Sequence, residues 1–423
     1  MAVTQVSAEE WRAQNGVFLA LWTDQTHAYA LYAPDRLVAV PLQAGAYPAL
    51  PHPAASWFQR LAKDLHGHVA TGFEAPYPAI AQFREADGRA PWPSFTGPED
   101  EGVNQLALGP VYGILNEPAH FRVFVRGEQI MQLQTRLGYA HRGVLGLMLG
   151  KSPRQAARYA ARLVGDATVA HALAFARAAE AALGVDAPAR ARGLREIMLG
   201  LEQIAVQCGV LAAMAAALGS ALLQSRAAVL RDYICAAAQA AFGHRLMMDL
   251  VVPGGVAVDM AESGAAVIQD ALGAVEAELP DLQRGFGTPG MRELMSGVGD
   301  VSPALAARYA VPAGDVAARL HARLEAVAES LVQVRAVVAS LEPGAVGLVL
   351  PALTGMGLGC AQSSRGEVWS WLKLDNGQIQ GAFMVDPSCQ IWPVLEMVSM
   401  NQNLVNFPLI AASFNASCAA VDM

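Results

Sequence analysis

An acid and an imidazole stand apart in an alanine-rich stretch of the chain. Residues 162–171 read RLVGDATVAH, in which Asp166 is the acid and His171 the imidazole. Carboxylates and imidazoles transfer protons near neutral pH when burial or neighbouring charges shift their pKa values. Asp166 is interpreted as a proton carrier or as an ion-pair partner of Arg162. His171 is interpreted as a hydrogen-bonded core histidine.

The cysteines of this sequence have no spacing that would indicate a disulfide or a metal site. Its five cysteines lie at positions 208, 235, 360, 389 and 418, and no two have C-x-x-C spacing. Scattered cysteines in odd number indicate a reducing cytoplasm and give neither a disulfide nor a zinc pattern. No metal site is predicted, and Cys418, in the segment SFNASCAAVDM at 413–423, is interpreted as a small buried residue.

The composition indicates a large protein that is covered by partners. The chain has 423 residues, of which 54% are hydrophobic and only 16% charged, against a usual quarter charged. We therefore expect other subunits to cover much of its surface. A net charge of −8 without a basic run argues against nucleic-acid binding. The N-terminus shows no signal-peptide pattern.

The most apolar stretch, residues 204–223, is long enough to cross a bilayer. It consists mainly of alanine and glycine and contains Gln207 and Ser220. Because small residues allow close contact between helices, the stretch is interpreted as a buried helix of a bundle.

The first part of the chain predicts a small α+β domain. Short apolar-aromatic runs at 16–23, 27–34 and 36–42 predict strands, and residues 56–67 predict a helix. We place this domain at 1–95 and a linker at 96–108.

Residues 109–423 predict a mainly α domain, a helix-bundle core with peripheral β hairpins. The hairpins are expected to turn at 126–128 and 375–377. Apolar residues at helical spacing predict the helices. Their expected ranges are 153–184, 188–223, 224–248, 256–278 and 313–341.

Several short motifs, taken in order, resemble one known family. They lie at 109–122, 136–143, 171–180, 195–202, 314–319, 364–367, 392–393 and 407–410. In them the chain resembles the large subunit of membrane-bound, energy-converting NiFe hydrogenases and the homologous D-type subunit of respiratory complex I. Residues 56–67 resemble the end of the complex I C-type subunit. The resemblance therefore implies a truncated C-type domain ahead of a D-type domain, as in formate-hydrogenlyase-type large subunits.

The resemblance implies that the ligands of a NiFe centre are absent. Such a centre needs four thiolates from two C-x-x-C pairs, because soft sulfur holds nickel and bridges it to iron. The matching positions are Val164 and Ala167 in one segment and Ser417 and Ala420 in the other. We therefore expect neither nickel binding nor hydrogenase activity.

The resemblance leaves four candidate proton-relay or cavity residues, Glu117, Asp166, His171 and Arg365. Glu117 matches a family carboxylate used in proton movement, and its alternative role is a helix- or loop-capping acid. His171 matches a histidine beside the first ligand pair. Arg365, with Arg142, is expected to pair with backbone or carboxylates around the former cavity.

The resemblance implies a weakened quinone site. Gly165 stands where complex I has a quinone-binding tyrosine, and residues 110–113 replace a histidine-containing motif. A family segment that lines the cavity is missing between Val311 and Pro312. The electron acceptor is expected to be a quinone or an unknown small molecule, and NAD binding is among the expected properties.

The implied function is that of a subunit of a membrane-bound, complex-I-like oxidoreductase assembly. The chain itself is expected to bind no cofactor, with a four-iron cluster in a B-type iron–sulfur partner. Antiporter-like and H-type membrane subunits would complete an assembly that couples redox or conformational change to ion translocation. The chain would lie at the cytoplasmic face of the inner membrane. The alternative is a non-catalytic scaffold or maturation factor.

Overall fold

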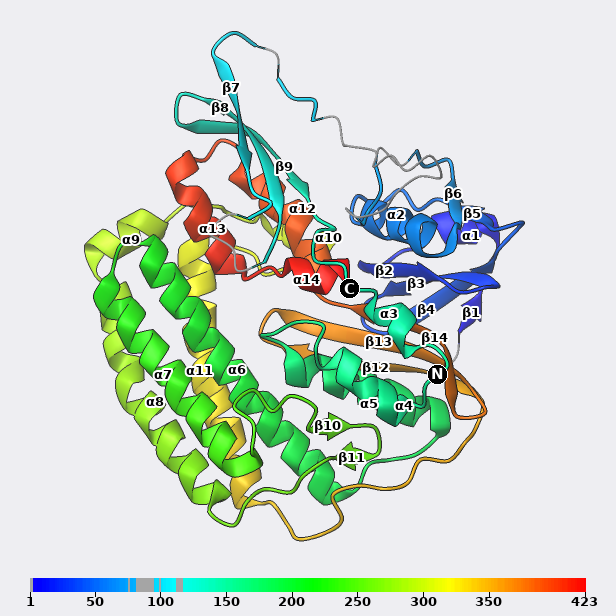
Figure 1. The fold of residues 1–423 in the computed structure, drawn as a ribbon. Coiled ribbons are helices and arrows are strands. Elements are labelled where there is room, and N and C mark those ends of the chain that lie inside the picture. Colours follow the sequence, from blue (N-terminus) through cyan, green and yellow to red (C-terminus); the bar gives the residue numbers. More distant parts are fainter. Residues whose placement is uncertain (1–2, 75–76, 81–94, 99, 112–116) are drawn as a thin grey trace.

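The computed structural model describes the chain except for residues 1–2, 75–76, 81–94, 99 and 112–116. Figure 1 shows a helical bundle on one side, an N-terminal sheet with its helices on the other, and a C-terminal sheet between them. The prediction of helices with several small sheets is confirmed at this level.

The N-terminal region folds as the apolar-aromatic runs predicted. Its sheet has the order β1-β4-β3-β2, and β5 and β6 form a separate parallel pair. The elements are β1 (Thr4–Gln5), α1 (Ala8–Arg12), β2 (Phe18–Thr23), β3 (His27–Tyr32), β4 (Arg36–Pro41), β5 (Ala46–Pro48), α2 (Ala55–His66) and β6 (Val69–Thr71). The three strands predicted over 16–42 and the helix predicted over 56–67 are confirmed.

An aromatic cluster joins this region to the C-terminal sheet. The rings of Trp22 and Phe383 stack with centroids 5.2 Å apart, and those of Tyr29 and Trp371 lie 5.0 Å apart. At the edge of the cluster, Lys373 Nζ lies 2.7 Å from Asp24 Oδ2. Burial raises the pKa of Asp24, but Lys373 and hydrogen bonds outweigh it and lower that pKa to about 2.

A three-stranded antiparallel sheet follows, with β8 in its middle. Its strands are β7 (Val103–Leu108), β8 (His120–Arg126) and β9 (Gln129–Arg136). The hairpin predicted at 126–128 is confirmed. The segment 96–108, which we expected to be a linker, contributes β7 to this sheet.

The helical bundle contains α6, α7, α8 and α11, which run side by side in Figure 1. The helices from the third to the eleventh are α3 (Val144–Met148), α4 (Pro153–Ala160), α5 (Thr168–Leu183), α6 (Ala189–Ala217), α7 (Ala221–Phe242), α8 (Gly264–Phe286), α9 (Pro289–Met295), α10 (Pro303–Tyr309) and α11 (Val316–Ala339). Helix α8 starts later than predicted, because residues 255–256 pair in a short hairpin.

Helix α6 is the one helix in the described part of the chain that is long and apolar enough to cross a membrane. Of its most apolar window, 72% is buried inside the protein. It therefore packs as a core helix of the bundle, as its small residues predicted.

A buried ion pair fixes the short hairpin of β10 (Val251–Val252) and β11 (Gly255–Val256) to the bundle. Arg195 Nη2 lies 2.5 Å from Glu180 Oε1, and Glu180 also accepts a bond from the Gly254 amide. Arg195 donates to the carbonyls of Val252 and Gly255. Neither charge is left alone in the core, where an unpaired one would cost on the order of several kcal/mol.

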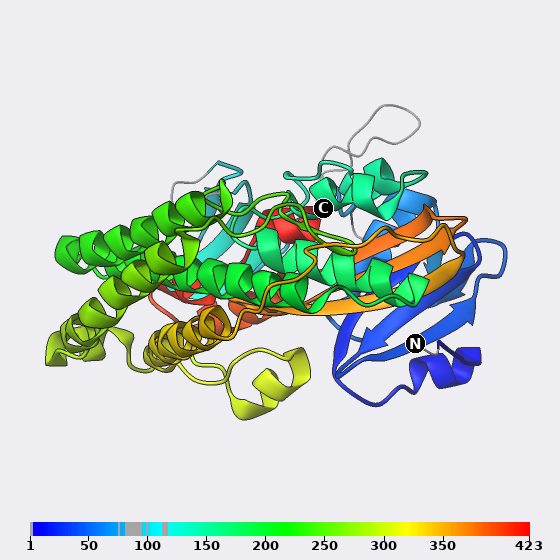
Figure 2. The same cartoon turned by 90° about the horizontal axis from the view of Figure 1, so that it is seen from below.

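The C-terminal sheet lies directly on α5 (Figure 2). Its strands are β12 (Gly355–Ser363), β13 (Gly366–Asp375) and β14 (Gln378–Val385), with the predicted turn at 375–377. A Cβ added to Gly357 would lie 2.1 Å from the carbonyl oxygen of Ala178. Gly355 and Gly359 meet Ala182 and Ala174 in the same way. Alternate glycines and alanines four residues apart thus bring strand and helix backbones into contact.

The remaining helices return the chain to the loop before α5. They are α12 (Ser388–Ser399), the 3-10 helix η1 (Leu404–Asn406), α13 (Phe407–Phe414) and α14 (Cys418–Asp422). Glu396 of α12 accepts a 2.6 Å bond from the Thr135 amide of β9. Burial raises the pKa of Glu396 to about 7.

Candidate functional site

The first candidate segment, residues 162–171, begins as a loop, so the prediction of one helix over 153–184 is wrong here. Helix α4 ends at Ala160 and α5 begins at Thr168. The side chain of Arg142 donates to the carbonyls of Arg162 and Leu163, which a continuous helix would have used itself. The long-range contact with Arg142 thus replaces helical hydrogen bonds, which local propensity cannot reveal.

The second candidate segment, residues 413–423, is held against this loop. Helix α13 ends at Phe414, and its C-cap Asn415 adopts a left-handed conformation with φ 54°. Asn415 Nδ2 donates to Asp166 Oδ2 at 3.0 Å. The amide of Arg142 donates to the carbonyl of Met423 at 3.1 Å, so Arg142 contacts both segments.

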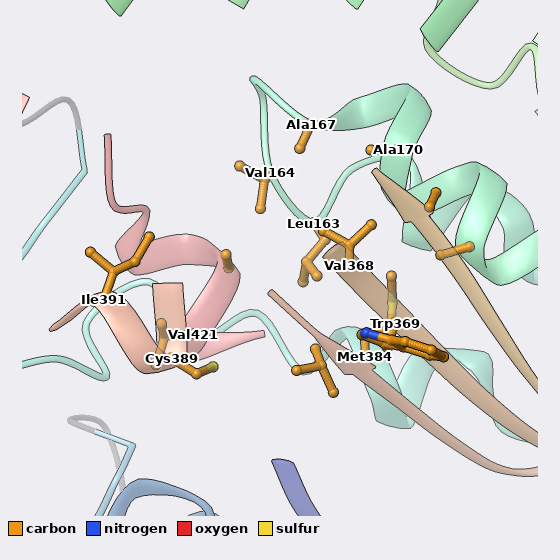
Figure 3. Packing of buried hydrophobic residues seen from close by; sticks show 14 of the residues in the cluster. Leu163, Val164, Ala167, Ala170, Val368, Trp369, Met384, Cys389, Ile391 and Val421 are labelled. Carbon is orange, nitrogen blue, oxygen red and sulfur yellow. The ribbon is translucent and has the colours of Figure 1, made fainter. Parts of the chain in front are cut away.

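The four positions matched to thiolate ligands are packed in the protein interior. Val164 is 2% exposed, Ala167 and Ala420 are 0% exposed, and Ser417 is 5% exposed. Figure 3 shows Val164 and Ala167 on the loop before α5, across from the segment that carries Val421. The Ser417 hydroxyl accepts a 3.0 Å bond from the Ala420 amide and thereby caps α14.

Arg365 is the centre of a buried ionic cluster between the two segments. Its Nη1 lies 2.7 Å from Asp166 Oδ2, and its Nη2 lies 3.2 Å from Asp386 Oδ2. Asp386 also accepts a 3.1 Å bond from His171 Nε2. The alternative pairing of Asp166 with Arg162 is wrong, because Arg162 pairs with Asp249.

The cluster favours the charged form of Asp386. Burial alone raises the pKa of Asp386, but the Arg365 guanidinium and the His171 bond outweigh burial and hold that pKa well below its usual range. Because Asp386 accepts from Nε2, that nitrogen carries the proton of His171. The structure thus places His171 as a core histidine with a hydrogen bond to Asp386.

Sequence reasoning missed Asp386. It follows β14 immediately and accepts bonds from the amide and hydroxyl of Ser388 at 2.8 and 2.6 Å. An acid at the end of a buried strand, followed by Pro387 and Ser388, was the signal available in the sequence. Its partner His171 lies 215 residues earlier, so only the fold brings them together.

Glu117 caps the second segment. It accepts a 2.8 Å bond from the Ser417 hydroxyl and a 2.9 Å bond from the Ala419 amide. The Ser417 amide in turn donates to Ser388 Oγ at 2.9 Å, and Ser388 binds Asp386. All four candidates, Glu117, Asp166, His171 and Arg365, therefore belong to one hydrogen-bonded network.

Glu202 is a second acid that sequence reasoning missed. It belongs to α6, and its carboxylate accepts bonds from the amides of Val169 and Ala170, at the start of α5, at 2.6 and 3.0 Å. Burial raises the pKa of Glu202 to about 8, although both amides lower it. Glu202 and Asp166 line a cavity of about 190 Å³ between α6, α7 and the loop before α5.

The donor atoms at this position do not fit a nickel–iron centre. Valine and alanine offer no ligand atom, and the Ser417 hydroxyl is bonded to Glu117 and to the Ala420 amide. Burial raises the pKa of the Cys418 thiol, which favours its neutral form. Within the residues that the structure describes, no three His, Cys, Asp or Glu side chains are grouped to hold a metal.

Comparisons with known proteins agree with the motifs. The nickel-dependent hydrogenase family model matches residues 142–207, which span Arg142, the loop before α5 and Glu202. Hydrogenase-4 component G of Escherichia coli is 23% identical over 418 residues, covering 88% of this chain and 74% of that protein. Membrane-bound hydrogenase subunit alpha of Pyrococcus furiosus is 27% identical over 182 residues, 43% of each chain.

A complex I protein and a solved structure extend this comparison. The D-type subunit of NADH-quinone oxidoreductase from Saccharopolyspora erythraea is 25% identical over 239 residues, 54% of this chain and 53% of that one. A chain in the structure of the membrane-bound sulfane sulfur reductase, an archaeal respiratory membrane complex, has the same fold. It aligns with a TM-score of 0.70 at 17% identity, over 77% of this chain and 100% of its own length.

The fold and the motifs define a class, which comprises the large subunits of membrane-bound hydrogenases and the D-type subunits of complex I. This chain is similar to proteins of both groups, and the resemblance seen in its sequence is confirmed. Its relatives are subunits of membrane-bound hydrogenase-like and complex-I-like assemblies.

Proposed function

We propose that this chain is a non-hydrogenase subunit of a membrane-bound, complex-I-like oxidoreductase assembly. The observation that carries the proposal is the cluster of Arg365 with Asp166 and Asp386 between the two segments. Guanidinium–carboxylate pairs with good geometry hold buried segments together without a metal. The cluster therefore supports a fold that is complete in the absence of nickel.

The chemistry of the four matched positions supports the same proposal. Thiolates are required to hold nickel, and Val164, Ala167, Ser417 and Ala420 supply none. The frame that presents these positions persists, while its side chains serve packing and helix capping. A hydrogenase reaction at this position would lack the thiolate ligands that hold its metals.

The role of the chain in the assembly is to couple a partner's redox or conformational change to ion movement. Glu202, with its pKa raised to about 8, holds a proton at neutral pH beside the partly exposed Asp166. A charge change at a neighbouring redox group would shift this protonation through electrostatics. Both acids line the same cavity, so solvent can exchange the proton.

The proposed partners are those that the resemblance of the sequence implies. They are a B-type iron–sulfur subunit with a four-iron cluster, and antiporter-like and H-type membrane subunits. The chain would lie at the cytoplasmic face of the inner membrane, held by these partners. An electron acceptor such as quinone would bind to the assembly. The low charge of the chain supports coverage of its surface by other subunits.

Purification of the tagged chain from its native membrane tests the proposal. We expect iron–sulfur and polytopic membrane subunits in stoichiometric amounts, with iron but without stoichiometric nickel. The same purification from untagged cells is the control. Nickel in equal amount to the chain would overturn the proposal. Recovery of a free chain, or of a chain bound only to another large subunit, would favour the scaffold or maturation role instead.

A further inference from the structure

A groove of about 890 Å³ lies between α6 and α11, away from the ionic cluster's two acids. These two helices run antiparallel, since Gln207 contacts Arg323 and Gln203 contacts Ser330 farther along. The loop 310–312 and the turn between β12 and β13 also line it. Its size is that of a site for a small organic molecule.

Three buried arginines line the groove, and one of them, Arg365, is already paired with the acids of the ionic cluster. Arg319 and Arg323 lie one turn apart on α11 and are 3% and 8% exposed. Arg323 donates to the carbonyl of Ser413 at 3.1 and 2.7 Å and to Gln207 Oε1 at 2.7 Å. Arg319 donates to the Ser413 hydroxyl and to the carbonyls of Gly314 and Gly299.

Neither Arg319 nor Arg323 is paired with a carboxylate in the described part of the chain. The hydrogen bonds of the two guanidinium groups within that part go to neutral oxygens, in contrast to those of Arg365. Burial, together with the nearby charges of Arg319 and Arg365, lowers the pKa of Arg323 to about 10, although Asp166 raises it. Burial also lowers the pKa of Arg319 to about 10, although Asp315 and Asp300 raise it. Within the described residues Arg319 hydrogen-bonds to neither acid, and Asp315 instead accepts from the Ala318 amide. A buried charge of this kind is stabilised by an anion.

A further polar group of the groove is available to a ligand. The Ser364 hydroxyl lines the groove, is buried, and has no hydrogen-bond partner among the described residues. Buried polar atoms without partners are rare in native proteins, and a ligand is one explanation for them. The acids of the groove, Glu196 and Glu329, are displaced along the helices. Glu196 is eleven residues from Gln207, roughly 16 Å along α6.

We propose that this groove binds a small amphiphilic anion, with its carboxylate or phosphate group at Arg323 and Arg319 and its apolar part between α6 and α11. Leu199, Ala326 and Val334 line the groove beyond the arginines and offer the apolar surface. Ser364 would donate its hydroxyl to the same oxyanion. The proposal does not depend on the nickel question or on the partners of the chain.

Gln207→Glu is the decisive variant. Its new carboxylate would lie where Gln207 Oε1 now accepts from Arg323 at 2.7 Å, and so supply the missing counter-charge from within. The substitution gives up the 3.3 Å hydrogen bond that Gln207 Nε2 donates to the Ser364 carbonyl. We therefore expect a folded protein in which anion binding is weakened about tenfold or more.

Titration of the full chain with octanoate, octyl phosphate and octanol, followed by calorimetry, tests the proposal. We expect saturable binding of at least one anion, weak or no binding of octanol, and loss of binding in Gln207→Glu. Arg335→Gln is the matched control, because Arg335 lies on the same helix, pairs with Glu276 and is outside the groove. It should bind as the natural chain does.

The outcomes separate clearly. Preference for octanoate or for octyl phosphate identifies the head group and supports the site. Equal binding of octanol, unchanged binding in Gln207→Glu, or no saturable binding of either anion would overturn the proposal. Circular dichroism of each variant shows whether it is folded, and Ser364→Ala provides a second variant with the arginines intact. We expect Ser364→Ala to weaken anion binding by severalfold, about the contribution of one hydrogen bond.

Discussion

Arg365 satisfies two carboxylates that come from different parts of the chain. Asp166 precedes α5 and Asp386 follows β14, and the guanidinium lies between them. Its flat, forked array of donors suits this double role, which lysine cannot reproduce. The pKa of Arg365 is lowered by burial, yet both acids outweigh burial and raise it. The cluster is therefore charged and mutually dependent.

Removal of Arg365 is expected to be among the most damaging single changes. Arg365→Gln leaves Asp386 buried without its cation, which costs about 3–5 kcal/mol in the free energy of unfolding. Urea denaturation of the two proteins measures this loss. Arg126→Gln, which breaks the exposed pair with Asp100, is the control and should change stability by about 1 kcal/mol or less. Similar losses in both variants would contradict the role of the cluster.

Glu202 gives the protein a characteristic dependence of stability on pH. Its folded pKa, about 8, is above the ordinary value of 4.5, so the folded state holds the proton more tightly. The contribution of Glu202 to the free energy of unfolding is therefore fully present below pH 4.5 and is lost as pH rises towards 8. Between these pH values, the free energy of unfolding contributed by Glu202 falls by up to roughly 1.4 kcal/mol per pH unit.

Comparison of the natural chain with Glu202→Gln isolates this contribution. Glu396 and Asp422, whose pKa values burial raises to about 7, act in the same direction in both proteins. The glutamine side chain can accept only one of the two backbone hydrogen bonds, so the Glu202→Gln protein is less stable than the natural chain at low pH. We expect the difference between the two proteins to shrink from pH 5 to pH 8, about the window set by the two pKa values. A constant difference would show that Glu202 is ionised throughout.

At the scale of elements, the contact between β12 and α5 depends on glycine. A Cβ at position 357 would meet the Ala178 carbonyl oxygen at 2.1 Å and the Ala182 amide at 2.5 Å, which are backbone atoms that cannot rotate away. We expect Gly357→Ala to destabilise the protein by about 3 kcal/mol through overpacking. Thermal unfolding measures the effect.

Gly273 provides the matched control for this substitution. It lies inside α8, and a Cβ added there would meet no atom within 4 Å. Gly273→Ala is expected to be neutral or to stabilise the protein by about 0.5–1 kcal/mol, because alanine is the better helix former. If both substitutions have the same effect, the close contact of strand and helix is not the reason why glycine is needed at position 357.

Sequence patterns predicted the elements whose signals are local. Turn residues at 126–128 and 375–377 specify their own hairpins, and the alanine-rich helical spacing specifies α6, α7 and α11. The break at 161–167 was missed, because it depends on bonds from Arg142. The contact of β12 with α5 was missed as well, since glycine in a strand indicates close approach but not the partner.

The candidate site was predicted only in part, for the same reason. Asp166, His171 and Arg365 were selected from motifs, and the structure brings them together. Asp386, which links them, and Glu202, which lies beside them, carry no local signal of their connection. Their roles depend on pairings over 33 to 215 residues, which only the packed fold determines.

At the scale of the whole molecule, the aromatic cluster fastens the N-terminal region to the rest. Trp22 is buried and stacks on Phe383, while also lying 5.6 Å from the ring of Trp371. The ion pair of Lys373 with Asp24 adds one polar contact at the edge. This attachment places the N-terminal sheet beside β13 and β14, which belong to the sheet whose strand β12 packs on α5 (Figure 1).

Trp22→Ala is therefore expected to loosen the N-terminal region from the rest of the protein. Loss of a buried tryptophan costs about 3–5 kcal/mol, and here the loss falls on contacts that both parts share. We expect limited proteolysis to release a C-terminal fragment that begins after α2, and chemical denaturation to show two transitions. Leu222→Ala, at a position 68% exposed on α7, is the control and should leave one transition. A single transition at lower stability in Trp22→Ala would mean that the two regions unfold together even without this contact, and that the aromatic cluster supports the core rather than a joint.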